Sequence, residues 1–437
     1  MNDTATSAPV ADRPHLPWWT SPAGLTMGFL LPVLFLIAYV GEANISTVTI
    51  RGTRFLTLGY IELAAVFLLV IALSGWFGAR LRLRPVAPAN RGDWDRAAVV
   101  VGSIALLAYA VWFKDYLLSP SLLLQTLLGA IQHERSESEL TPGLTSLANF
   151  APAFFSLYAF RVAFPGPRIT RAMHLLCAVM IPVTVFRVYV WQERLAFIEA
   201  TVPFALAAGA MAIRSRRTAI RALVLGGPFV ALPGLVLYFG AAEYVRSWAS
   251  PTYSGKTGFW DFAIGRIASY YYTSFNNGAG ALATTQWPTY DFENTLSWLH
   301  RAPFGIGPQF SALIGFTHSW GEPFLYAYGD PEFNSPSGIY AVICEMGVGP
   351  AMGYFAVVAV IAGMLSRAYG EGRLIGAALY PIFFMSLLEI FRYPYLGTPR
   401  AFTWTLGVGL VLLLLLARRR AGDAAAQSLD AGEPRTA

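Results

Sequence analysis

Residues 401–420 read AFTWTLGVGLVLLLLLARRR, an apolar run that ends in three consecutive arginines. About 20 apolar residues in a helix span the hydrocarbon core of a bilayer, so this run is long enough to cross a membrane. Arginines beside a span are retained on the cytoplasmic side. The stretch therefore predicts a transmembrane helix that ends in the cytoplasm.

Comparable apolar runs recur along the 437 residues of the chain. Charged residues make up only 13% of the sequence, about half of the fraction typical of a soluble domain. This composition excludes the soluble classes and predicts an all-α polytopic integral membrane protein with about ten transmembrane helices. The predicted spans are 23–41, 56–78, 97–113, 147–164, 172–190, 195–213, 222–240, 343–366, 375–391 and 401–417.

The distribution of arginine predicts how these spans are oriented. The net charge is +6, and every short loop that falls inside when both termini are cytoplasmic is basic. We interpret this basicity as a topology signal beside the lipid bilayer, not as a nucleic-acid surface. The predicted order is a disordered cytoplasmic tail (1–22), helices one to seven (23–240), one large outward-facing loop (241–338), helices eight to ten (339–417) and a cytoplasmic tail (418–437).

The sequence carries no motif for a metal or a cofactor. Its two cysteines lie in apolar spans and its five histidines lack metal-ligand spacing. A P-loop and the common hydrolase motifs are missing. The DWD of residues 93–95 matches a pattern that binds metal–nucleotide sugars, but it precedes a span, so we interpret it as a helix cap. We expect neither a metal nor a cofactor.

Ionisable residues in the apolar segments are predicted to lie toward one side of the membrane. A charge inside a bilayer is costly and normally faces a bundle interior or a wet cavity. In this arrangement the inward halves of the spans carry essentially no charge. The set of ionisable residues in the outward halves therefore predicts an outward-facing cavity that binds an anion. The set is Glu62, Arg187, Glu193, Arg194, Glu199, Glu345, Glu389, Arg392 and Arg400.

The first cluster, FRVYVWQERLAFIE at 186–199, covers the tight outer turn between the fifth and sixth spans. Two guanidinium groups, those of Arg187 and Arg194, would bind a pyrophosphate with paired hydrogen bonds. The alternative is that these arginines anchor the helices at the interface and form a structural ion pair. Glu199 lies about one turn deeper and requires a partner in either case.

The second cluster, EIFRYPYLGTPR at 389–400, forms the outer turn before the last span. Glu389 and Arg392 are i,i+3 neighbours and are expected to pair. Arg400 stands at the head of the last span. It is either an interface anchor or a second phosphate contact beside the first cluster.

The third cluster, WDFAIGRIASYYYTSFNNGAG at 260–280, belongs to the large loop. Aromatic rings beside amides suit a sugar, because its C–H faces stack on rings while its hydroxyls form hydrogen bonds. The alternative is an aromatic belt at the membrane interface. The residues we expect to contact a sugar here are Arg266, Tyr271, Asn276 and Asn277.

Two further stretches resemble a known family. The turn LHRAPFGIGPQF (299–310) and the segment NSPSGIYAVICEMGVG (334–349) are similar to the late outward loop of the O-antigen polymerase/ligase superfamily of membrane glycosyltransferases. The tyrosine-rich run and the turn before Arg400 look more like its Wzy-type oligosaccharide repeat-unit polymerases. The resemblance covers most of the chain and implies a GT-C-like membrane architecture.

The resemblance has one informative departure. O-antigen ligases place a His-Asn pair where this chain has Pro336 and Ser337, which favours a polymerase and leaves the general base unassigned. The family's arginine carries over to Arg194, but its R-x10-G spacing does not, since the corresponding position is Ala205. Arg301 and Glu345 lie in the two matching stretches, and with Arg392 they complete the expected substrate contacts.

The resemblance implies an enzyme of the inner, cytoplasmic membrane that polymerises polyprenyl-pyrophosphate-linked oligosaccharide repeats in the periplasm. Donor and acceptor would both be lipid-linked, and a chain-length regulator and a flippase of the same pathway would be partners. Arg187, Arg194 and Arg400, with Glu199, would be its catalytic residues. The alternatives are a ligase that moves glycan to another acceptor, or a transporter of an anionic lipid-linked substrate. A transporter would be expected to carry internal repeats, and we find none in the sequence.

Overall fold

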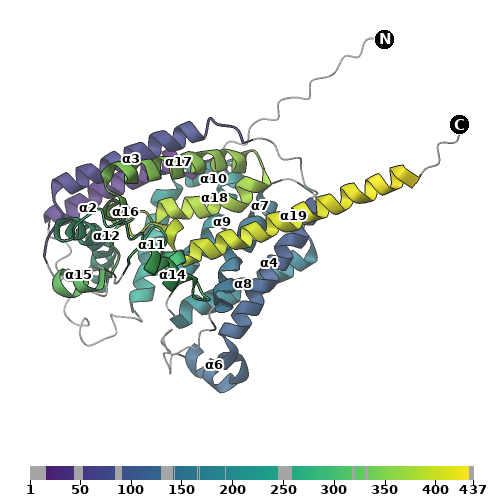
Figure 1. Cartoon of the computed structure of the whole chain (residues 1–437), viewed down its shortest axis with the longest axis horizontal. Helices are drawn as coiled ribbons and strands as arrows, with labels where there is room; N and C mark the ends of the chain where they lie inside the picture. Colours follow the sequence, from purple (N-terminus) through teal and green to yellow (C-terminus); the bar gives the residue numbers. More distant parts are fainter. Residues whose placement is uncertain are drawn as a thin grey trace, which may run out of the picture.

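The described part of the chain is helical and contains no strand (Figure 1). The computed structural model describes residues 16–43, 53–83, 91–128, 141, 143–164, 166, 168–191, 193–244, 258–316, 319, 321–329 and 333–432.

Seven helical stretches in these ranges are long and apolar enough to cross a membrane. They are the continuous run α1 (Pro22–Leu25), η2 (Thr26–Leu30) and α2 (Leu31–Ala43), then α3 (Leu58–Gly78), α4 (Arg91–Trp112), α8 (Arg171–Trp191), α9 (Arg194–Ala212), α17 (Val348–Gly370) and α19 (Pro399–Gly432). An eighth candidate combines α10 (Thr218–Leu225) and α11 (Gly227–Glu243), which are bent by 74°. The chain is therefore a multi-pass helical membrane protein.

Two of the ten predicted spans form helices shorter than a bilayer needs. Residues 147–164 fold as the 3-10 turn η4 (Thr145–Phe150) followed by α7 (Ala151–Ala163), and residues 375–391 as α18 (Leu374–Leu388). Eleven of the 13 residues of α7 are buried, so this helix is covered by protein. A helix surrounded by other helices does not need the length of a lipid-facing one.

Glycines let α3 and α17 pack closely along their length, and the two helices lie side by side in Figure 1. A Cβ at Gly78 would lie 2.1 Å from the carbonyl oxygen of Val360, and a Cβ at Gly363 would lie 2.2 Å from that of Gly75. Small residues that allow backbones to approach are the usual basis of helix association in membranes.

We expect Gly363→Ala to lower the free energy of unfolding by about 1–3 kcal/mol, because the added methyl overlaps backbone atoms and the helices must separate. Thermal unfolding of the purified protein in detergent measures the change. Gly353→Ala on the same helix is the control, since a Cβ there meets nothing within 4 Å. Equal stability of the two variants would contradict the close packing.

Both predicted tails are partly ordered. The prediction of a disordered segment over 1–22 is wrong for residues 16–22, where Trp18 and Trp19 donate their indole N–H groups to carbonyls at the end of α10. Carbonyls in a last helical turn lack intrahelical partners, which makes them available acceptors. Residues 1–15 lie outside the described ranges.

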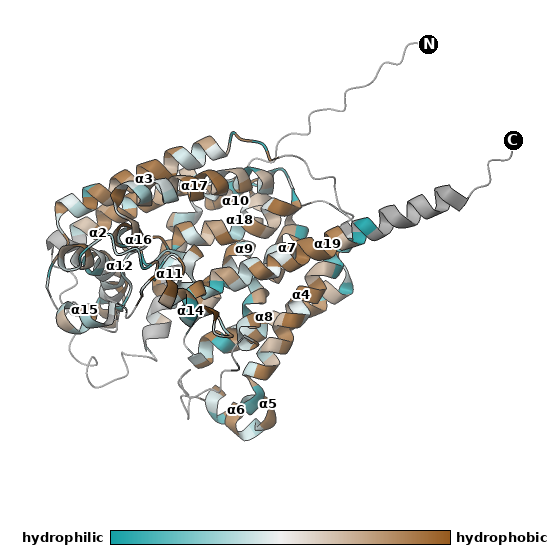
Figure 2. Ribbon diagram, in the orientation of Figure 1, coloured by the Kyte–Doolittle hydropathy of each residue, from teal (hydrophilic) through white to brown (hydrophobic). Residues whose placement is uncertain are grey.

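The predicted tail from residue 418 is helical as far as Gly432, because its alanine-rich sequence continues α19. In Figure 1 α19 extends beyond the bundle, and Figure 2 shows the hydrophilic arginine segment where it leaves. Residues 433–437 lie outside the described part of the chain.

Short helices occupy the two polar interruptions. The first holds α5 (Lys114–Leu118) and α6 (Pro120–Leu127). The large loop holds α12 (Phe259–Thr284), α13 (Ser297–His300), α14 (Ile306–Leu313) and α15 (Gly321–Tyr328), and is followed by α16 (Gly338–Met346). α12 packs against α11 and α16, so the loop is seated on the bundle.

Candidate functional site

The fold brings the two charged outer turns of the sequence together. One turn joins α8 to α9, and the other, which includes the 3-10 turn η7 (Tyr395–Gly397), joins α18 to α19. α18 contacts α9 and α19, and η7 contacts α18 and α19, so the four helix ends meet.

Two arginines and two glutamates form a continuous network at this meeting point. Arg187 contacts the Oε2 atom of Glu193 through Nη2 at 2.6 Å and through Nε at 2.8 Å. Arg400 donates to the same Oε2 atom at 2.6 Å through Nη2, and to Glu199 at 3.0 Å through Nη1. We call these four residues, Arg187, Glu193, Arg400 and Glu199, the outer network.

The two arginines of the outer network differ in what they can reach. Arg187 is 2% exposed and also donates to Tyr109 and Asn149, and its guanidinium lies over the Trp112 ring at 4.8 Å. The side chain of Arg400 is 18% exposed. Arg187 is therefore a positioning residue that holds Glu193, and Arg400 is the member open to a ligand.

Glu199 has partners on both carboxylate oxygens. It is 2% exposed, accepts a hydrogen bond from the Tyr395 hydroxyl at 2.8 Å, and pairs with Arg400. We predicted from the sequence that Glu199 requires a partner. That partner is Arg400, which lies about 200 residues away in the chain. A buried carboxylate held in this way positions Arg400.

Arg194 is the first residue of α9, next to the outer network, and is partly buried. It interacts electrostatically with Tyr238 on α11. The ring of Tyr238 stacks on Phe197 with centroids 4.9 Å apart. The two arginines that the sequence predicted to act as one clamp therefore have different surroundings.

The predicted pair of Glu389 and Arg392 is confirmed, with 2.9 Å between Oε2 and Nη1. Arg392 also donates to the Tyr270 hydroxyl at 2.6 Å, and lies over that ring at 4.6 Å. Tyr270 belongs to the third sequence cluster and Arg392 to the second, so α12 brings the two clusters into contact. The guanidinium of Arg392 also lies 5.2 Å from the centre of the Tyr393 ring, which is 6.5 Å from the ring of Tyr395. Because the Tyr395 hydroxyl donates to Glu199, this pair and the outer network are contiguous.

Tyr271 lies beside this pair. Burial, and secondarily the negative charge of Glu389, raise the pKa of Tyr271 to about 12. Its phenol is therefore protonated at neutral pH and is able to donate a hydrogen bond.

Asn276 and Asn277, which we expected to contact a sugar, bond within the protein. Asn276 is 4% exposed, accepts from the backbone N–H groups of Phe55 and Leu56, and donates to the Thr53 carbonyl. Asn277 donates to the Phe333 carbonyl at 2.6 Å. The side-chain amide of Asn276 fixes the start of α3 on α12, so the fold uses it and does not present it to a ligand.

Glu345 also has a structural partner set. It lies at the end of α16, outside the spanning helix α17, and is fully buried. Its carboxylate accepts from the backbone N–H groups of Asn294 and Thr295, and from the Thr295 hydroxyl at 2.6 Å. A Cβ at Gly397 would lie 2.1 Å from the Asn294 carbonyl oxygen, so Glu345 holds the loop directly on the turn before Arg400.

Burial raises the pKa of Glu345 to about 7, although its hydrogen bonds favour the charged form. The unfolded chain loses this proton near pH 4.5 and the folded protein near pH 7, so stability falls as pH rises through that window. We expect Glu345→Gln to show a smaller fall in Tm between pH 5 and pH 8 than the wild type. Asp261→Asn, at an exposed carboxylate, is the control. A pH dependence unchanged in Glu345→Gln would contradict the assignment.

Three other charged residues of the predicted set are placed as follows. Arg301 is exposed at the end of α13, and the Trp298 ring of α13 stacks on Phe402 at 4.0 Å, near Arg400. Arg266 lies on α12, but its side chain is outside the described residues. Glu62 is exposed on α3.

Ion pairs at the opposite end of the bundle show that two predictions are wrong. Asp95 and Arg161 are 1% and 4% exposed and pair at 2.7 Å, so the end that we predicted to face inward does hold buried charge. Asp95 also accepts from the backbone N–H of Thr170, and Asp93 pairs with Arg418 at 2.8 Å. The DWD motif therefore forms ion pairs between helices, where we expected a cap.

Sequence reasoning did not single out Tyr109, Asn149, Tyr270, Tyr393 or Tyr395 as site residues. The available signal is weak, since each is a single polar group near the end of an apolar run or within an aromatic stretch. Within the described ranges, no group of three His, Cys, Asp or Glu side chains is arranged to hold a metal ion.

Comparison with known proteins adds no identification. The chain matches no family model, no curated protein and no solved structure.

Proposed function

We propose that this protein is a membrane glycosyltransferase that polymerises polyprenyl-pyrophosphate-linked oligosaccharide repeats. The observation that carries the proposal is the outer network with Arg400 partly exposed at its edge. A fixed guanidinium beside a loop rich in aromatic residues suits a substrate that joins an anionic leaving group to a sugar.

In this proposal the acceptor hydroxyl attacks the anomeric carbon of the donor glycan and gives its proton to a carboxylate base, and the lipid pyrophosphate leaves with the bonding electrons. Arg400 stabilises the negative charge that develops on that leaving group. Glu193 and Glu199 hold its guanidinium in place before the reaction, at 2.6 and 3.0 Å. A preorganised donor of this kind contributes about 3–4 kcal/mol to transition-state stabilisation.

Charge balance explains how the proposed site persists without a substrate. The contiguous clusters hold three arginines (Arg187, Arg392, Arg400) and three glutamates (Glu193, Glu199, Glu389). A neutral network avoids the cost of unpaired charge when the site is empty. Arg392 and Arg400, whose side chains are each 18% exposed, are the members positioned to contact a phosphate.

The proposal includes a topology. Ten helical segments cross the inner membrane, with both termini in the cytoplasm and the loop of α12 to α15 in the periplasm. The distribution of basic residues supports this topology. Residues such as Arg214, Arg373 and Arg418 lie at the end of the bundle opposite to the outer network.

A ligase and a transporter are the competing functions. Deleting the gene and separating the surface glycan by gel distinguishes them. Loss of the ladder with retention of lipid capped by a single repeat supports a polymerase. Loss of all capping indicates a ligase or a transporter and contradicts the proposal.

Arg194→Ala is expected to abolish polymerisation at normal expression, because Arg194 matches the outward-facing arginine of the glycosyltransferase family and directly follows Glu193 of the outer network. Arg194→Lys is expected to restore little of it, because an ammonium group does not reproduce paired hydrogen bonds. The glycan ladder of a complemented deletion strain measures both. Arg216→Gln, an exposed arginine near the other end of α9, is the matched control. Full activity of Arg194→Ala would remove Arg194 from the proposed site.

A further inference from the structure

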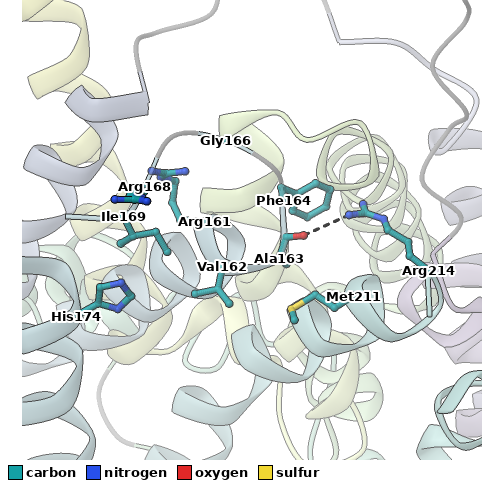
Figure 3. A pocket seen from close by; sticks show the side chains of 10 residues that line it. All are labelled: Arg161, Val162, Ala163, Phe164, Gly166, Arg168, Ile169, His174, Met211 and Arg214. Atoms are coloured by element: carbon teal, nitrogen blue, oxygen red, sulfur yellow. Dashed lines mark hydrogen bonds between the residues drawn. The ribbon is translucent and has the colours of Figure 1, made fainter. Parts of the chain in front are cut away.

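A basic pocket lies at the end of the bundle opposite to the outer network. The end of α7, the start of α8 and the end of α9 surround it, with a volume of roughly 610 Å³ (Figure 3). His174 marks its position on α8, 13 residues before Arg187. A helix rises 1.5 Å per residue, so the pocket and the outer network are about 20 Å apart along α8.

The pocket has the charge of an anion site. Arg161, Arg168 and Arg214 line it, and none of the described lining residues is a carboxylate. Figure 3 shows Arg161 and Arg168 on one side and Arg214 on the other. The carboxylate that pairs with Arg161, Asp95, is buried and also accepts from a backbone N–H.

The arginine at the far side is held in place by the protein. Arg214 donates to the Ala163 carbonyl at 3.3 Å, and its guanidinium lies 4.9 Å from the centre of the Phe164 ring. A guanidinium has five N–H donors, so these contacts leave others for a ligand. Arg168 is exposed across the pocket.

The rim of the pocket is apolar and exposed. Val162 and Met211, which line it, are 45% and 47% exposed. On a membrane protein such side chains face acyl chains. The cavity therefore places arginines at the level of lipid headgroups and hydrocarbon contacts immediately beside them.

We propose that this pocket binds the phosphate headgroup of an anionic phospholipid, with Arg168 and Arg214 on the phosphate and an acyl chain against Val162 and Met211. Basic pockets between helices at the cytoplasmic surface recognise anionic headgroups in this way. A free phosphate would satisfy the arginines, but it would leave the apolar rim without a role. The inference does not depend on the glycosyltransferase proposal.

The test uses the full chain purified in a nonionic detergent. Native mass spectrometry measures binding of phosphatidylglycerol, with phosphatidylcholine and inorganic phosphate as comparison probes. We expect phosphatidylglycerol to bind in preference to phosphatidylcholine, and the double variant Arg168→Gln with Arg214→Gln to bind it roughly tenfold more weakly. Arg216→Gln, exposed near the pocket but not lining it, is expected to bind as the wild type does.

Other outcomes overturn the proposal. Equal binding by the double variant and the wild type excludes the pocket as the site. Equal binding of phosphatidylcholine excludes recognition of anionic headgroups, and displacement of the lipid by millimolar phosphate indicates a phosphate site instead. Because Arg214 also holds α7, Arg168→Lys with Arg214→Lys is measured in parallel. This variant keeps both charges, and its failure to bind better than the glutamine variant would contradict an electrostatic site.

Discussion

Replacing Arg400 by alanine is expected to abolish the proposed polymerisation and to lower the free energy of unfolding by about 3–5 kcal/mol. The side chain pairs with Glu193 and Glu199, which are 8% and 2% exposed, and both carboxylates would lose this partner. Removing one member of a buried ion pair is costly because a charge stays buried without compensation. The glycan ladder in cells and thermal unfolding in detergent measure the two effects.

One variant separates the loss of activity from the loss of stability, and a second is the control for stability. Arg400→Lys keeps the charge but not the forked donors, so it is expected to recover part of the stability and little activity. Arg301→Ala removes an exposed arginine of the neighbouring loop and is expected to unfold as the wild type does. Wild-type activity in Arg400→Ala would refute the role assigned to the outer network.

Replacing Asp95 by alanine is expected to destabilise the protein by about 3–5 kcal/mol, because Arg161 would remain buried without its carboxylate. The measurement is thermal or denaturant unfolding in detergent. Asp93→Ala is the matched control, since its pair with Arg418 lies at the surface, with side chains 29% and 45% exposed, and surface pairs contribute no more than about 1 kcal/mol.

A double variant tests the origin of this loss. Asp95→Ala with Arg161→Met removes both charges and is expected to be more stable than Asp95→Ala alone. If the double variant is less stable than the single one, the loss arises from packing around Asp95 and not from an unpaired charge.

The sequence predicted the helical membrane class well because the signal is local. An apolar run such as 401–417 is recognised without knowledge of any other part of the chain. The pairing of Glu389 with Arg392 was equally accessible, since i,i+3 neighbours meet on any helix. The short length of α7 could not be predicted in this way, because it depends on the neighbouring helices that bury α7 in place of lipid.

Polar residues in the large loop show where sequence reasoning fails. Asn276 looked like a sugar ligand because it lies among tyrosines, yet its amide bonds to backbone more than 220 residues away. Glu345 looked like a substrate contact and instead holds the loop at Asn294 and Thr295. A residue type states which hydrogen bonds are possible, and only the fold states which partner is near.

The sequence by itself determined that this chain crosses a membrane repeatedly and carries arginines and glutamates in the turns before α9 and α19. Only the tertiary structure decided that Arg400 is partly open while Arg187 is enclosed. The physical reason is that hydrophobicity acts along a local run of residues, whereas an ion pair depends on contact. The partners of Arg400 lie 201 and 207 residues away in the chain, and they come together because α18 packs against both α9 and α19.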